Sequence, residues 1–234
     1  MPPQSIRQTD AGRPDLGSEP DSPAQTWLHA RARLMPDLLS QSPPWVRGVF
    51  DHSWAPMRAL ARQVNLLPPH IWRQLLCWEG GYAAICTGDS EYTAGPASIR
   101  YQHVANVAFV SVEDLAADTE RPLHVLGHLI DHHLGCGGDF EGDWLSAGGG
   151  MSKRWRQAGQ RLPELFALGH SVDPVAQSNV RDYFAQSLAL FCRDRKRLNV
   201  ADPLIYKWLR NTLWNRAFWQ ADQDKGKGDQ RTDG

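Results

Sequence analysis

Residues 124–135 read HVLGHLIDHHLG, and this segment constrains the fold of the chain more than any other. His124 and His128 are four positions apart, so on an α-helix they share one face and can bind a single metal ion. Asp131 lies one turn further on and could accept the second ring N–H of a bound histidine, fixing its tautomer. Gly127 leaves room for a neighbouring element to approach. We therefore expect a metal-site helix over residues 119–135.

The residue that follows the first histidine departs from the metal motif that this spacing suggests. In the pattern HExxH it is a glutamate, which serves as the general base of a zinc peptidase. Here it is Val125, which can neither take nor give a proton. The alternative interpretation is a helix that simply carries several histidines, one face buried and one solvated. The segment thus predicts a metal site without an intact catalytic residue.

The rest of the chain predicts an α+β fold that is mostly helical. Apolar residues recur at helical spacing in five further segments, residues 27–39, 54–64, 69–80, 178–193 and 203–220. Three short β-favouring segments precede the histidine helix, and we expect them to form a small antiparallel sheet from residues 82–87, 97–101 and 106–110. The glycine-heavy stretch 137–150 is expected to be a flexible loop.

Both ends of the chain are polar and lack periodicity. We expect disordered tails at 1–24 and 222–234, and a single domain at 25–221 between them. No apolar run approaches the ~20 residues of a membrane span, and the N-terminus has no signal-peptide pattern, so we expect a cytoplasmic protein. Export by a route without such a signal stays open. The four cysteines contain no CxxC pair, which argues against a zinc ribbon.

Charge is distributed unevenly along the chain. Residues 1–150 carry a net negative charge and residues 151–220 a net positive one. Basic clusters at 153–156 and 193–197, with tryptophans nearby, offer a nucleic-acid-binding reading. We favour charge complementarity within one fold, because the basic residues are diluted by apolar ones.

The chain also resembles a known family, the lethal-factor-like zinc metallopeptidases, which include anthrax lethal factor and the pro-Pro endopeptidases. That family shows HExGHxxDxxxG on one helix and, on a later helix, roughly E-[FY]-F-A-E-[AS]-F-A-x-[FY]. Residues 182–191 read DYFAQSLALF, similar in shape and spacing to the second pattern. The resemblance implies a zincin-like domain over residues 25–221, with a zinc site formed by the two helices.

The departures from the family fall on the residues that carry its chemistry. Gln186 stands where the family has its third zinc ligand, a glutamate, so His124, His128 and Gln186 would form a weakened site. Asp182, one turn before Gln186, could serve as a substitute ligand. The family also tends to place a tyrosine shortly before this helix to stabilise the oxyanion, and residues 172–179 contain none.

These changes predict a catalytically inactive homologue that binds a polypeptide or partner protein in the former substrate cleft. The peptide would lie along the edge of the small sheet. We expect zinc binding to be weak or absent. The first alternative is a weakly active zinc-dependent peptidase with a rewired base, and the second is the nucleic-acid-binding protein described above. No membrane partner is expected.

Overall fold

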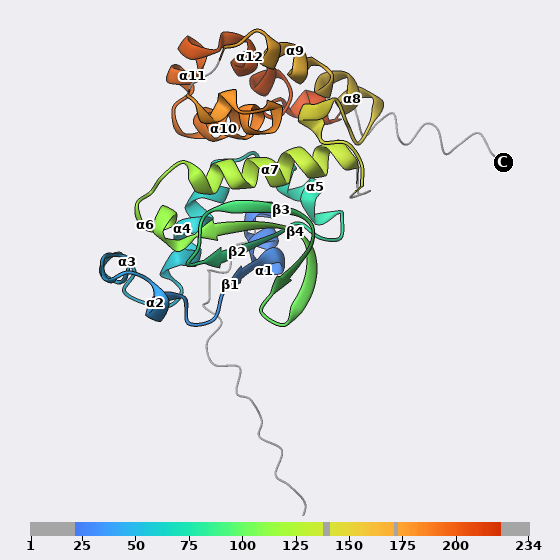
Figure 1. The fold of residues 1–234 in the computed structure, drawn as a ribbon. Helices are drawn as coiled ribbons and strands as arrows, with labels where there is room; N and C mark the ends of the chain where they lie inside the picture. Colours follow the sequence, from blue (N-terminus) through green and yellow to red (C-terminus); the bar gives the residue numbers. More distant parts are fainter. Residues whose placement is uncertain (1–21, 138–140, 171–172, 221–234) are drawn as a thin grey trace, which may run out of the picture.

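The helix that carries the histidine motif, α7 (Arg121–Cys136), lies between two layers of the molecule (Figure 1). The structure is a computed structural model that describes residues 22–137, 141–170 and 173–220. On one side of α7 lies a sheet with the helices of the N-terminal half, and on the other lie the helices of the C-terminal half. Because α7 contacts both layers, almost every one of its residues is buried.

The part of the N-terminal layer that the structure describes contains six helices, and proline stands in the first turn of several of them, where its missing N–H is harmless. They are α1 (Pro23–Arg31), α2 (Leu38–Gln41), α3 (Pro44–Val49), α4 (Ala55–Val64), α5 (Pro69–Leu76) and α6 (Val112–Ala116). The first of these helices begins with a capping box, in which Ser22 and Gln25 exchange side-chain and backbone hydrogen bonds. The helix predicted at 54–64 is confirmed as α4, and the one predicted at 69–80 is confirmed as α5 but ends earlier, at Leu76.

The sheet has four strands in the order β1-β2-β4-β3. They are β1 (Ala32–Leu34), β2 (Tyr82–Cys86), β3 (Glu91–Ile99) and β4 (Gln102–Ser111). β2 pairs in parallel with β1 and with β4, whereas β3 and β4 pair antiparallel. The predicted small sheet is confirmed, but the expectation that it is wholly antiparallel is wrong, since β3 folds back along the outer edge of β4 and leaves β2 and β4 side by side in one direction.

The single helix predicted at 27–39 is also wrong. α1 ends at Arg31 and the next three residues form β1, because there they gain a parallel ladder with β2 (Ala32 opposite Ala83). Pro36 then disfavours helix in the residue before it. Of the predicted N-terminal tail, residues 1–21 lie outside the described residues, and Pro23 already belongs to α1.

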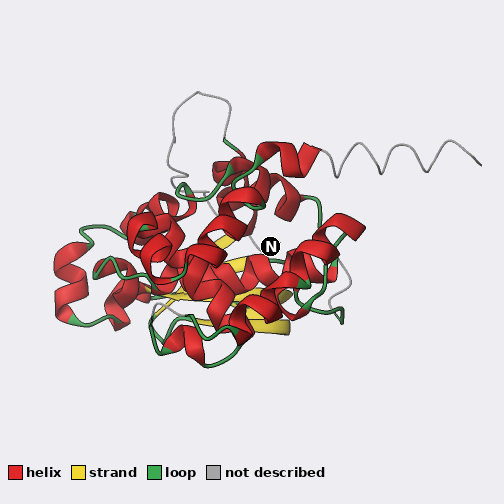
Figure 2. Ribbon diagram, turned by 90° about the horizontal axis from the view of Figure 1, so that it is seen from above, coloured by secondary structure: helices red, strands yellow, loops and turns green. Residues whose placement is uncertain are grey.

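The C-terminal layer consists of α8 (Lys153–Gly159), α9 (Arg161–Ala167), α10 (Val180–Arg193), α11 (Arg195–Ala201) and α12 (Pro203–Asn211). The prediction at 178–193 is confirmed as α10. The one predicted at 203–220 is too long, since α12 ends at Asn211. Phe218 and Trp219 are buried beyond it, as expected for a docked segment. Seen from above, helices cover one face of the sheet (Figure 2).

Side chains of alternate strand residues join the helical core on that face. Ala83, Ile85, Ala108 and Val110 belong to the main apolar cluster, whereas Ala84 and Val107 belong to a small cluster on the opposite face. The helices that the structure describes include none long and apolar enough to cross a membrane. The fold is α+β and mostly helical, as predicted.

Candidate metal centre

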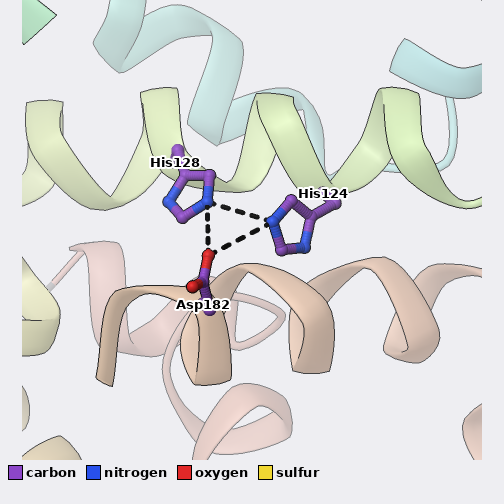
Figure 3. A group of neighbouring side chains, drawn as sticks. All are labelled: His124, His128 and Asp182. Atoms are coloured by element: carbon purple, nitrogen blue, oxygen red, sulfur yellow. Dashed lines mark hydrogen bonds and ion pairs between the residues drawn. The ribbon is translucent and has the colours of Figure 1, made fainter. Parts of the chain in front are cut away.

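The two helices of the predicted site, α7 and α10, pack directly against each other. A Cβ atom added at Gly127 of α7 would lie 2.9 Å from the Cα of Ala185 in α10, closer than any real contact. The glycine thus permits the approach that the sequence predicted for it. This packing places Asp182 of α10 opposite His124 and His128 of α7 (Figure 3).

Three side-chain atoms converge between these helices. The Nε2 atoms of His124 and His128 are 3.1 Å apart, and Oδ1 of Asp182 lies 3.5 and 3.2 Å from them, respectively. Two imidazole nitrogens and one carboxylate oxygen form a donor set that suits zinc and several other divalent first-row metals. The two histidine side chains are 4% and 14% exposed and the aspartate is 25% exposed, so a ligand reaches the cluster from the side of Asp182. This cluster could hold a metal ion.

Gln186 lies beside the cluster but on the far edge of the His124 ring. Its Nε2 donates to Glu120 (3.1 Å) and Asp173 (2.8 Å), and its Oε1 accepts a hydrogen bond from Nδ1 of His124 (3.0 Å). The prediction that Gln186 contributes the third ligand is therefore corrected. It is the proposed substitute, Asp182, that lies with the two histidines, and Gln186 holds one of them in place.

The Gln186 contact also fixes the tautomer of His124. Because the amide oxygen can only accept, Nδ1 must carry the proton, which leaves a lone pair on Nε2. Burial, and to a smaller extent the neighbouring His128 and Arg121, lowers the pKa of His124 to about 4. The ring is consequently neutral near pH 7, with its free lone pair directed into the cluster, as a metal ligand requires.

Asp182 is ionised and held in place by the residue that caps its own helix. Asn179 is the N-cap of α10, and its Nδ2 donates to Oδ2 of Asp182 over 2.6 Å. Oδ1 remains for the cluster. The hydrogen bond from His128 lowers the pKa of this carboxyl group, against the opposing effect of its partial burial.

The cluster lines a cavity of about 450 Å³ that opens between α7, α10 and β3. Val125, at the position where the HExxH pattern has its glutamate, lines this cavity too. Tyr92 of β3 and Trp144 complete an aromatic wall, their rings 5.5 Å apart. The hydroxyl of Tyr92 forms a 2.7 Å hydrogen bond with Nδ1 of His132, which draws that histidine away from the cluster.

Sequence reasoning missed several residues that line the cavity. Tyr92 and Trp144 are single side chains on separate segments, and no spacing pattern links them to the histidine motif. Arg121 lies three positions before His124 on α7, so helical spacing could have placed it on the same face. The predicted absence of a tyrosine concerned residues 172–179, and Tyr92 approaches from the sheet instead. Position 172 itself lies outside the described residues.

Asp131 holds the segment after α7. Its two oxygens accept hydrogen bonds from the backbone N–H (2.7 Å) and the hydroxyl group (2.5 Å) of Ser146. Burial raises the pKa of this carboxyl group to about 7, although the bonds from Ser146 oppose the shift. The predicted role for Asp131 is corrected. Of the flexible loop predicted at 137–150, residues 138–140 lie outside the described residues, and the described part departs from the prediction because Leu145 and Ser146 are fully buried.

Replacing Asp131 by alanine should therefore destabilise the fold without weakening the metal site. The change leaves two buried donors of Ser146 unpaired, and we expect the free energy of unfolding to fall by about 3 kcal/mol. Zinc affinity, measured by titration below the unfolding transition, should stay within about threefold of the parent. A loss of about 10–100-fold, as removal of a ligand's hydrogen-bond partner produces, would contradict this. The matched control is Ser146→Ala, which removes the hydroxyl group that donates to Asp131.

Comparison with known proteins leaves the family open. The chain matches no family model, no curated protein and no solved structure. The resemblance to lethal-factor-like metallopeptidases therefore remains a prediction that depends on two motifs, and the geometry of the cluster is the stronger basis for assigning a function.

Proposed function

We propose that this protein binds zinc and a polypeptide in the cleft between α7 and α10 and does not hydrolyse the polypeptide. The observation that carries the proposal is the convergence of His124, His128 and Asp182 beside a valine. The two histidines and the aspartate are a donor set for a metal ion, whereas the valine has no group that could transfer a proton. Zinc, when bound, would act as a Lewis acid towards an oxygen of the ligand.

Metal binding is supported by the order already present in the donors. His124 has the correct tautomer because of Gln186, and Asp182 is fixed by Asn179. Preorganised ligands lose little conformational freedom when an ion binds. We therefore expect tighter zinc binding than Gln186 as the third ligand would give.

Peptide binding is supported by the position of β3 beside the cavity. β3 stands at the end of the strand order, so among the described residues its outer edge has no strand partner. Ser90, Glu91 and Tyr92, at the start of β3, line the cavity that holds the cluster. An extended peptide can add to such an edge through main-chain hydrogen bonds and so pass the metal site. The cavity volume is within the range of ligand-binding clefts.

The test is to measure the metal and the peptide separately on the full chain. We expect one zinc ion per chain after dialysis against the metal, none in the His124→Ala variant, and peptides that bind the loaded protein but are recovered intact. Stoichiometric zinc with steady cleavage of the peptide pool would refute the inactive assignment. Absence of zinc from the parent would refute the metal site.

A second candidate function, a weakly active metallohydrolase, is favoured by one observation. Glu91 of β3 lines the same cavity as the cluster and is a carboxylate that the donor set does not use. If slow peptide cleavage appears, Glu91→Gln should abolish it while zinc remains bound. Persistent cleavage in that variant would assign the proton transfer to another group.

A further inference from the structure

Two arginines line the same cavity as the metal-binding cluster. Arg121 comes from α7 and Arg181 from α10, so they border the cavity from two different helices. Nη2 of Arg121 donates to the carbonyl of Ser90 over 3.3 Å, and the guanidinium of Arg181 lies 4.2 Å from the centre of the Trp144 ring. Within the described parts of the chain, neither arginine forms an ion pair with a carboxylate.

The charges that line the cavity do not balance when a metal is bound. The carboxylates are those of Glu91 and Asp182, and the second belongs to the metal-binding cluster. Two arginines and a divalent cation carry more positive charge than these two carboxylates carry negative charge. The loaded cavity is therefore positively charged, although the chain as a whole carries a net charge of −1. Such a cavity attracts and concentrates anions.

The two arginines also occupy positions that do not stabilise their own helices. Arg121 is the first residue of α7 and Arg181 the second of α10. A cation in the first turn of a helix is disfavoured by about 0.3–1 kcal/mol, and no ion pair offsets this cost. The stacking of Arg181 on Trp144 holds its planar guanidinium in place and leaves its N–H groups available for a two-point contact with a carboxylate.

We infer that the cleft selects polypeptides that present a carboxylate group, either an acidic side chain or a free C-terminus, which Arg121 and Arg181 bind beside the metal. This inference rests on the proposed function, because it names the class of peptide that the same cleft takes. Both sources of the carboxylate offer the arginines the same chemistry.

The experiment compares three pools of short unlabelled peptides on the zinc-loaded full chain by isothermal titration calorimetry. The first pool contains Asp and Glu and has amidated ends, the second replaces them with Asn and Gln, and the third is the second with free C-terminal carboxylates. We expect a carboxylate pool to bind about tenfold more tightly than the neutral pool. Arg121→Gln and Arg181→Gln should each reduce this preference while zinc content stays at the parental level. Arg62→Gln, on an exposed arginine of α4, should leave it unchanged.

Each outcome is decisive. Equal binding of the neutral and carboxylate pools, or a preference that persists when both cavity arginines are replaced, overturns the inference and leaves the proposed peptide binding intact. Failure of every pool to bind overturns the proposed function, and the inference falls with it. Preference for the third pool over the first identifies a C-terminal carboxylate as the source, and the reverse identifies an acidic side chain.

Discussion

We expect Asp182→Asn to reduce zinc affinity more than removal of a ligand's hydrogen-bond partner does. That removal costs about 10–100-fold. Asp182 supplies the one negative charge among the three converging donors, and its Oδ1 lies 3.2 and 3.5 Å from the two histidine nitrogens. Asparagine has nearly the same shape, but it brings no charge to the ion. Competition with a chelator of known affinity, at constant pH, measures the change.

The matched variant is Gln186→Leu, at the position where the family resemblance places the third ligand. Leucine removes the acceptor that fixes the His124 tautomer, so zinc affinity should fall within about 10–100-fold. The ranking of the two variants decides the coordination. A larger loss for Gln186→Leu than for Asp182→Asn would make the glutamine a direct ligand and contradict the geometry.

The helices of the site were predictable because their sequence signals are local. The spacing of His124 and His128 fixes one helix face, and the apolar period of residues 178–193 gives α10. Gly127 predicted the close approach of a second element, and the structure places Ala185 there. In each case the signal lies within a few turns of the residue that it concerns.

The parts that failed depend on contacts between distant segments. β1 has only three residues and exists because β2 lies beside it, so no local period could have revealed it. The pairing of β2 with β4 likewise depends on where β3 folds. Asp131 sits at helical spacing from His128, but its actual partner, Ser146, lies in a stretch whose glycines suggested a flexible loop.

The choice between Asp182 and Gln186 shows the same limit within one helix. The two residues are one turn apart, and spacing alone could not say which would face His124 Nε2. Glu120 and Asp173 decide it, because their carboxylates accept both N–H bonds of the glutamine amide and turn its oxygen towards Nδ1. A glutamate at 186, which the resemblance implies for a zinc ligand, would set three carboxylates against one another, so Gln186→Glu should destabilise the fold.

Val125→Glu alone is the direct test of whether a base at this position is what the cleft lacks. Val125 lines the cavity next to His124 and is 1% exposed, so a glutamate there would reach the cavity that contains the cluster. Asp182 already completes the donor set, and no change at Gln186 is needed. A positioned general base contributes about 10²–10⁴-fold to the rate of such reactions. We expect zinc-dependent peptide cleavage to rise by at least about 100-fold over the parent.

The control is Val125→Gln, which has nearly the same size as the glutamate variant but cannot accept the proton of the attacking water. Cleavage should appear with glutamate, vanish when zinc is chelated, and stay at the parental level with glutamine. Thermal unfolding of both variants shows whether the buried polar group is tolerated. A folded, zinc-loaded Val125→Glu protein that cleaves no peptide would mean that the valine is not what keeps this cleft inactive, and it would count against the family resemblance.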